Sequence, residues 1–198
     1  MHLEDKKLDI LKARLAILDV ETTGIDPEEH ELISLSLIRV EVDSISGELL
    51  KVVNSYTGQR EPTKPFPANL EEIIGVTEAA FAGKQLDIAI IHGMLEGCEL
   101  VIAHNAAFDR SFLAPHFSIP VQCKWACSLR DIDWFNTEQQ PNASIDHLLS
   151  FYQLTASSNS TADDCRALIE ILARPLPVSG RTGFAALMES ARRNEYGD

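Results

Sequence analysis

The chain has 198 residues, of which 45% are hydrophobic and 24% charged, and this composition excludes a wholly disordered protein. The formal net charge of −13 argues against a protein that coats long nucleic acids, although it is compatible with an enzyme that grips only a strand end. No apolar run reaches the roughly 20 residues of a membrane span and no signal-peptide core is present, so we expect a cytoplasmic protein with no membrane association.

The first part of the sequence predicts three consecutive strands. Residues 14–20 form a short apolar run that is typical of a buried strand, and residues 31–42 partly alternate between apolar and polar side chains. The Ser46-Gly47 turn then leads into a third strand over residues 48–56, which gives a strand–turn–strand meander. Three prolines between residues 62 and 67 make the next stretch a loop.

The rest of the chain is mostly helical in its pattern, with one further strand over residues 100–103. Helices are predicted over residues 69–74, 86–96, 105–116, 144–152 and 161–173. Ser160 or Thr161 is expected to cap the last of these helices. Residues 181–198 are predicted to form either a short amphipathic helix or a tail. The pattern as a whole favours an α/β fold, with a mixed sheet of about five strands and helices on both faces.

Two carboxylates, Asp19 and Glu21, close the first predicted strand. Because side chains alternate across a strand, these two point to the same face and can converge on one metal ion. The Thr22-Thr23-Gly24 turn that follows offers amides and hydroxyls for a sugar or a phosphate. Taken alone, this pattern is more typical of a solvated strand end.

Further polar residues lie where a predicted strand runs into a helix, over residues 103–109 (AHNAAFD). In this segment Phe108 can stack on a base, and Asp109 lies in the first or second helical turn. Another carboxylate, Asp164, lies early in the last long helix. Taken alone, core packing explains Phe108, and compensation of a helix dipole explains both aspartates.

The order of these three patterns resembles the DEDD superfamily of 3′–5′ exonucleases, which are DnaQ-like proteins with a ribonuclease H-like fold. The resemblance covers about residues 15–172. Residues 19–24 (DVETTG) are similar to the first motif of that family, and residues 74–77 (IGVT) to the segment that precedes its second motif. Residues 144–148 (SIDHL) are similar to its late leucine-rich helix.

The resemblance implies a two-metal exonuclease that releases nucleoside 5′-monophosphates from the 3′ end of single-stranded DNA or RNA. Four carboxylates are implied as ligands of two Mg²⁺ or Mn²⁺ ions, namely Asp19, Glu21, Asp109 and Asp164. A second set of residues is implied near the terminal nucleotide, namely Thr22, Thr23, Asn105 and Phe108. The resemblance also implies an exonuclease-like domain over residues 1–175, followed by a C-terminal tail or short helix over residues 176–198 that is not a separate domain.

The sequence departs from the family at the general base. The histidine-type branch has a His five residues before the last Asp, where this chain has Asn159, and the tyrosine-type branch expects Tyr at the position of Ser160. If Asp163 were the ligand instead, the two positions would hold Ser158 and Asn159. A neutral amide cannot accept the proton of the attacking water, and loss of a general base typically costs about 10²–10⁴-fold in rate.

Three interpretations of this departure stay open. The enzyme is slower and Asn159 only orients the water, or His147 or His104 replaces the missing base, or the domain binds nucleic-acid ends without cutting them. We favour a metal-dependent exonuclease, because all four carboxylates are present. The alternative is a non-catalytic module that binds nucleic-acid ends or a polymerase-type partner, and a third interpretation is an unrelated α/β domain with acidic strand ends.

The acidic charge also suggests how the protein contacts its partners. A nuclease without a basic platform can use substrate-binding surface from a second copy of the chain, as a homodimer, or from a polymerase-type partner. The choice between DNA and RNA depends on contacts to the 2′-hydroxyl, so the sequence is compatible with both.

Overall fold

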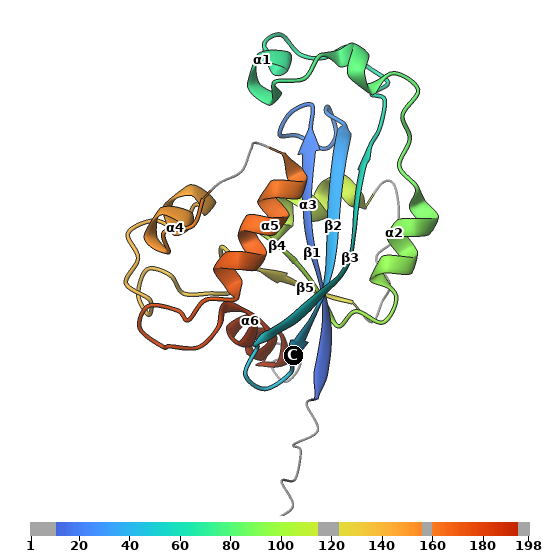
Figure 1. The fold of residues 1–198 in the computed structure, drawn as a ribbon. Coiled ribbons are helices and arrows are strands. Elements are labelled where there is room, and N and C mark those ends of the chain that lie inside the picture. Colours follow the sequence, from blue (N-terminus) through green and yellow to red (C-terminus); the bar gives the residue numbers. More distant parts are fainter. Residues whose placement is uncertain (1–10, 115–122, 156–159, 194–198) are drawn as a thin grey trace, which may run out of the picture.

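The computed structural model describes residues 11–114, 123–155 and 160–193 (Figure 1). Its centre is a five-stranded sheet in the order β3-β2-β1-β4-β5. The strands are β1 (Lys12–Thr22), β2 (Leu32–Asp43), β3 (Leu49–Gln59), β4 (Leu100–Ala103) and β5 (Lys124–Cys127). Strand β2 runs antiparallel to β1 and β3, whereas β4 runs parallel to β1 and β5. This arrangement confirms the predicted mixed sheet.

The order of the strands along the chain agrees with the sequence prediction, apart from β5. The meander β1-β2-β3 and the short strand β4 form where they were predicted, although β1 and β3 are longer than expected. Strand β5 was not recognised in the sequence because its four residues (KWAC) do not form a continuous apolar run like that of β4 (LVIA). Its extended conformation depends on parallel pairing with β4, which the local pattern does not encode.

The helices within the described residues also follow the prediction closely. They are α1 (Leu70–Ile74), α2 (Ile88–Leu95), α3 (Ala106–Leu113), α4 (Ile145–Phe151), α5 (Thr161–Leu172) and α6 (Gly183–Arg193), with a 3₁₀ helix η1 (Glu78–Phe81) that the sequence analysis missed. Helix α3 was expected to reach residue 116, and residues 115–116 lie outside the described residues. In the part of the chain that the structure describes, no helix is both long and apolar enough to cross a membrane.

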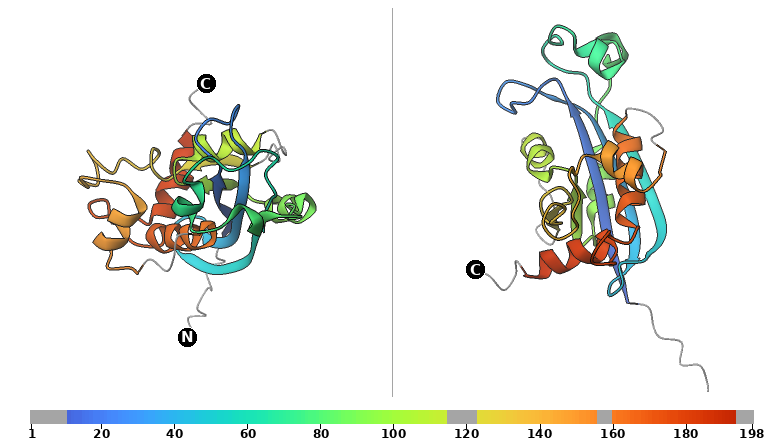
Figure 2. Two further views of the ribbon diagram at one scale, coloured as in Figure 1. Left: turned by 90° about the horizontal axis from the view of Figure 1, so that it is seen from above. Right: turned by 90° about the vertical axis from the view of Figure 1, so that its left-hand side faces the viewer.

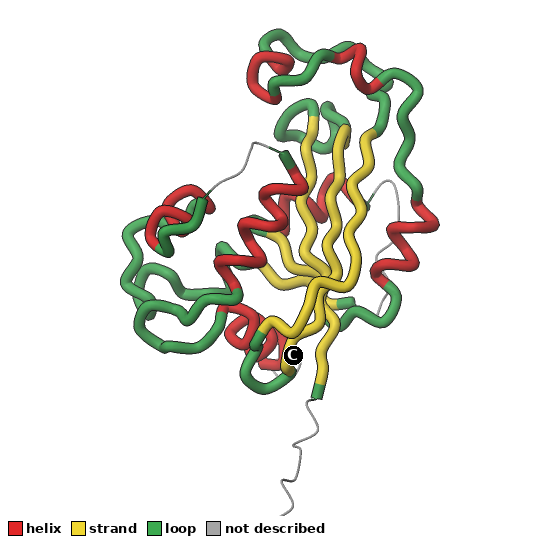
Figure 3. The backbone as a smooth tube through the Cα atoms, viewed as in Figure 1, coloured by secondary structure: helices red, strands yellow, loops and turns green. Residues whose placement is uncertain are grey.

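Helices cover both faces of the sheet, as predicted (Figures 2 and 3). Strand β1 is buried on both sides, because Leu15 and Ile17 belong to one core cluster and Ala16 and Leu18 to another. The first cluster also contains buried side chains of α5 and α6, and the second contains those of α2 and Leu113 of α3. A residue of β1 therefore points towards either the α5 layer or the α2/α3 layer, according to its place in the alternation.

The C-terminal helix α6 packs against the same core as α5. Its residues Phe184 and Leu187 are fully buried in the cluster that contains Leu172 of α5. The close approach of the two helices requires a glycine at position 183, because a Cβ atom there would lie 2.6 Å from Cδ2 and 2.9 Å from Cα of Leu172. The region after residue 175 therefore contributes apolar side chains to the main core.

Candidate active site

The first two predicted site residues, Asp19 and Glu21, lie near the C-terminal end of β1. They have the same parity as Leu15 and Ile17, so their side chains lie on the face of the sheet that α5 covers. Both side chains are partly buried. A register shift between Glu21 and the next residue then ends the regular pairing of β1 with β2. The sequence thus places two carboxylates side by side at an edge of the core.

Asp109 reaches the same region from helix α3. Strand β4 runs parallel to β1, so the segment that follows it starts at the edge of the sheet where Asp19 lies. Asn105 forms the N-cap of α3 in a left-handed conformation with φ of 73°, and its side chain makes no capping hydrogen bond. Asp109 is only 2% exposed, and its carboxylate lies near the backbone amide of Val20 in β1.

Asp164 is presented by the first turn of α5, and the structure distinguishes it from its neighbour Asp163. Asp163 belongs to the helix cap, because its carboxylate accepts a hydrogen bond of 2.7 Å from the Ser160 hydroxyl and one of 2.9 Å from Arg166. Asp164 is the one whose charge raises the pKa of both Asp19 and Glu21. Of the two aspartates that the sequence left open, Asp164 therefore faces the carboxylates of β1.

The four carboxylates influence one another electrostatically. Burial, followed by the charges of Asp109, Asp164 and Glu21, raises the pKa of Asp19 to about 8. Burial raises the pKa of Asp109 to about 7, although amides of its own residue and of Val20 oppose this shift. The pKa of Glu21 is raised by burial and then by Asp164. Burial, with smaller effects of Asp146 and Asp163 outside this group, also raises the pKa of Asp164. Such a concentration of negative charge is costly without a cation.

The chemistry of these donors fits a divalent cation. Carboxylate oxygens are the ligands that Mg²⁺ and Mn²⁺ prefer, and a bound cation would remove the repulsion that raises the pKa of Asp19. Among the described residues, however, no group of three or more His, Cys, Asp or Glu side chains is arranged to hold a metal ion. The carboxylates are thus close enough to influence one another, and the binding of a metal ion by them stays a prediction.

The threonines of the predicted substrate turn have different surroundings. The Thr22 hydroxyl donates a hydrogen bond of 2.6 Å to the carbonyl of Gly24. Thr23 is buried, and it closes the loop between β1 and β2: its amide donates to the Glu31 carbonyl and its hydroxyl accepts from the Glu31 amide, both at 2.8 Å. A Cβ atom at Gly24 would lie 2.2 Å from the His30 ring, so a larger residue there would require this ring to move. Contact with a nucleotide stays a prediction for both threonines.

The predicted residues of the second motif lie at the start of α3. Asn105 caps the helix through its backbone conformation, as described above. Phe108 is partly buried against the core layer of α2, and its ring lies 5.0 Å from that of Phe112, measured between centroids. The core interpretation of Phe108 therefore accounts for part of its surface, and stacking on a base stays a prediction for the exposed remainder.

The two histidines considered as substitute bases form hydrogen bonds with other residues. The His104 ring lies 2.9 Å from the Ser128 hydroxyl, and burial lowers the pKa of His104. The Nε2 atom of His147 lies 3.2 Å from the side-chain oxygen of Gln140. Asn159, which occupies the family's general-base position, lies outside the described residues.

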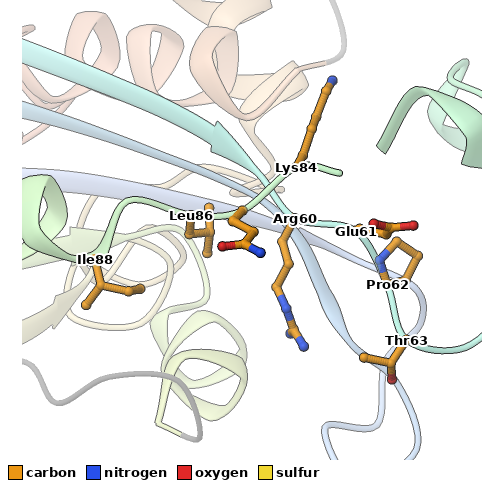
Figure 4. Close-up of a pocket in the computed structure, with 8 residues that line it drawn as sticks. Arg60, Glu61, Pro62, Thr63, Lys84, Leu86 and Ile88 are labelled. Carbon is orange, nitrogen blue, oxygen red and sulfur yellow. The ribbon is translucent and has the colours of Figure 1, made fainter. Parts of the chain in front are cut away.

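The sequence analysis did not recognise two hollows that share Arg60 in their lining. The larger, of about 470 Å³, is lined in part by Arg60, Lys84 and Leu86 (Figure 4). The smaller, of about 220 Å³, lies between Arg60, Lys64 and Phe112. Figure 4 shows Arg60 and Lys84 pointing to different sides, so the two cations do not converge on one point. No motif marks these residues, because they come together only through the loop after β3.

Comparison with known proteins identifies the class. A family model described as an exonuclease matches residues 16–172, which is most of the chain. The protein therefore belongs to the exonuclease family, in the DnaQ-like superfamily with a ribonuclease H-like fold. The matched region begins in β1 and ends at the last residue of α5, so it contains all four carboxylates.

The similar proteins are nucleases and polymerases. The chain is 23% identical over 192 residues to a PolC-type DNA polymerase III of Thermotoga petrophila, and 23% identical over 191 residues to that of Thermotoga maritima. Each match covers 89% of this chain but only 13% of the relative, so the chain spans about an eighth of their length.

Solved structures show the same fold. An exonuclease X in complex with 5′ overhanging duplex DNA has a TM-score of 0.58 and 22% identity, with 86% of this chain and 99% of that chain covered. An exonuclease I structure has a TM-score of 0.68 and 16% identity, with 92% of this chain and 44% of that chain covered. A 3′-exonuclease that recognises a histone mRNA stem-loop has a TM-score of 0.62 and 14% identity, with 81% of this chain and 80% of that chain covered.

Proposed function

We propose that the protein is a metal-dependent 3′–5′ exonuclease that releases nucleoside 5′-monophosphates from single-stranded DNA or RNA. The observation that carries this proposal is the group of carboxylates from β1, α3 and α5, within which burial and then the charges of the other members raise the pKa of Asp19 to about 8. Such a group is costly in a protein that does not bind cations and is suited to one that does. Exonuclease neighbours in complex with DNA support a nucleic-acid substrate.

The proposed ligands of two Mg²⁺ or Mn²⁺ ions are Asp19, Glu21, Asp109 and Asp164. When bound, such a pair of ions supplies activation of a water and stabilisation of the charge on the leaving oxygen. The residues of the chain orient the substrate: the turn at Thr22 and Thr23 holds the terminal nucleotide, and Asn105 and Phe108 limit the space around its base. Asn159 would orient the water through hydrogen bonds without accepting its proton, so we propose a slower enzyme than a histidine-type relative.

A non-catalytic module that binds nucleic-acid ends or a polymerase-type partner is the second candidate. Asn159 at the general-base position favours it, since an amide has no basic nitrogen. The match to a small part of much longer PolC-type polymerases is consistent with a polymerase partner. A second copy of the chain is a further candidate partner, for which the net charge of −13 is the motivation.

The experiment that separates the two candidates uses 5′-labelled single-stranded DNA and RNA of the same sequence. The protein is incubated with each strand in Mg²⁺ and then in Mn²⁺, beside the Asp19→Asn variant. Stepwise shortening from the 3′ end that is lost in the variant is expected for the exonuclease. Binding of either strand without shortening, in both metals, would establish the binding module instead.

A further inference from the structure

A group of buried hydroxyls joins helix α5 to strand β2. The Thr161 hydroxyl lies 2.7 Å from the Ser36 hydroxyl and 3.3 Å from the Ser34 hydroxyl. All three side chains are almost fully buried, with exposed fractions of 1% for Thr161, 0% for Ser36 and 3% for Ser34. Ser36 also lies 2.9 Å from the hydroxyl of Thr57 on β3. This hydroxyl network crosses from the sheet to the helix layer.

The network lies directly beside the carboxylates of β1. In the register of β1 and β2, Ser36 is opposite Asp19 and Ser34 is opposite Glu21. Directly opposite residues share a face of an antiparallel pair, so both serines lie on the face that carries the carboxylates and that α5 covers. Thr161 is the first residue of α5, and Asp164 follows one helical turn later. Two partners of one threonine hydroxyl are therefore the strand neighbours of two proposed ligands.

The network is not needed to cap the helix. Ser160 already serves as N-cap and accepts a hydrogen bond of 3.3 Å from the Asp163 amide. One turn further on, the Cys165 thiol makes only long contacts of 3.8 and 3.7 Å with the carbonyls of Ile17 and Ser36. Apolar packing is non-directional and tolerates small shifts of a helix along a sheet, whereas hydrogen bonds between one hydroxyl and two fixed serines do not.

We infer that Thr161 is a positioning residue, which holds the start of α5 against Ser34 and Ser36 so that Asp164 meets Asp19 and Glu21 at the spacing that a divalent cation needs. This inference rests on the proposed function and adds to it a residue that does not touch metal or substrate. A shift of α5 by one residue along its axis would displace Asp164 by about 1.5 Å, which is enough to break a metal–oxygen bond of about 2.1 Å.

The test compares three variants of the full chain. Thr161→Val keeps the shape of the side chain and removes the hydroxyl, and Thr161→Ser keeps the hydroxyl. Thr57→Val is the matched control, because it removes the other hydroxyl partner of Ser36 and leaves the contact to α5 intact. For each variant, Mn²⁺ affinity is measured by calorimetry without nucleic acid, and kcat and KM are measured on single-stranded DNA.

Residues that orient metal ligands without touching the metal typically contribute about 10–100-fold to metal affinity. We therefore expect Thr161→Val to weaken Mn²⁺ binding about tenfold and to lower kcat with little change in KM, while Thr161→Ser and Thr57→Val stay within about twofold of the wild type. Equal Mn²⁺ affinity in Thr161→Val and Thr57→Val would overturn the inference, even if both melt at lower temperature. A wild-type protein that binds Mn²⁺ but cuts neither DNA nor RNA would overturn the proposed function, and the calorimetric comparison would still decide the role of Thr161.

Discussion

Among the four carboxylates, Asp19 is the one whose negative charge is most disfavoured in the folded protein. Burial and three neighbouring acids raise its pKa from 3.8 to about 8. In the unfolded chain the same side chain loses its proton near its ordinary pKa, whereas the metal-free folded protein keeps it to much higher pH. Protonation of Asp19 therefore stabilises the folded state below about pH 4, and this contribution is lost as the pH rises towards 8.

We expect the metal-free protein to melt at a lower temperature at pH 8.5 than at pH 5.5, because the charged form of Asp19 is disfavoured by burial. The Asp19→Asn variant removes this charge, so it should melt about 5 °C above the wild type at pH 8.5 and show a flatter pH dependence. Melting curves of the wild type and of Asp19→Asn, recorded in the presence of a chelator across this pH range, test this prediction.

Added Mn²⁺ provides the control for this prediction. Since the metal binds the ionised carboxylates, it should raise the melting temperature of the wild type more at pH 8 than at pH 6, and should have little effect on Asp19→Asn. An Asp19→Asn variant that is no more stable than the wild type at pH 8.5 would contradict the assigned burial and repulsion.

Glu31 connects two segments that border the candidate site. Its backbone pairs with Thr23 in the turn after β1, and its carboxylate accepts hydrogen bonds from the Thr63 amide at 2.8 Å, the Thr63 hydroxyl at 2.9 Å and the Lys64 amide at 3.0 Å. An ion pair with Arg60 of 3.6 Å adds to these contacts. Burial opposes ionisation of Glu31, but these donors outweigh it and hold the pKa of its carboxyl below the usual range.

The Glu31→Gln variant should loosen the segment after β3, which leads to α1 beyond the ends of β1 and β2 (Figure 1). Both amides donate to the same oxygen, Oε2, which the oxygen of a glutamine could replace, but the variant loses the negative charge that strengthens these bonds and pairs with Arg60. We therefore expect faster hydrogen exchange at the amides of Thr63 and Lys64. Exposed Glu28 in the same loop gives the matched variant Glu28→Gln, for which exchange should stay unchanged.

The stabilisation that the Glu31 carboxylate provides depends on pH with the opposite sign to that of Asp19. Because the pKa of Glu31 is lowered on folding, its contribution is present above the ordinary pKa of 4.5 and is lost as the pH falls below it. Exchange at Thr63 and Lys64, corrected for its intrinsic pH dependence, should therefore rise in the wild type at low pH and change less in Glu31→Gln. Slow exchange at these amides in the variant would show that other contacts hold the segment.

Local patterns in the sequence were sufficient to predict most elements, and the resemblance to the exonuclease family indicated which carboxylates are candidate metal ligands. The alternation along β1 placed Asp19 and Glu21 on one face, and the cap predicted at Ser160 or Thr161 marked the start of α5, where the structure has Ser160 as the N-cap. Contacts between distant segments were not predictable in this way. The bond between Ser36 and Thr161 spans 125 positions, and nothing near either residue indicates it. The same holds for β5, which forms a strand only because β4 lies beside it.

The choice between Asp163 and Asp164 could not be made from the local sequence pattern and required the tertiary structure. Both aspartates lie in the first turn of α5, and either satisfies a helix dipole, so the sequence left both open. The hydrogen bond of Asp163 to the Ser160 hydroxyl and its ion pair with Arg166 direct it to the cap. Only the packing of α5 on the sheet decides that Asp164 faces β1.

The molecule as a whole depends on a core that continues past the region matched by the exonuclease family. That region ends at residue 172, yet four later side chains are almost fully buried in the cluster around α5, namely Leu176, Phe184, Leu187 and Met188. Burial of one such side chain contributes about 1.5–3 kcal/mol, so together they contribute roughly 6–12 kcal/mol. Typical domains have a total stability of about 5–15 kcal/mol.

A chain that ends at residue 175 should therefore fail to unfold as a cooperative unit, although it contains every proposed metal ligand. Two variants of the full chain isolate the cause. Phe184→Ala should lower the free energy of unfolding by about 3–5 kcal/mol, and Val178→Ala, at a side chain that is 54% exposed, should change it by less than about 0.5 kcal/mol. The stability of the shortened chain and of the two variants is measured by urea unfolding, monitored by circular dichroism. If the shortened chain unfolds with the midpoint of the full chain, residues 1–175 form an independent exonuclease-like domain, and α6 covers a surface that tolerates exposure to water.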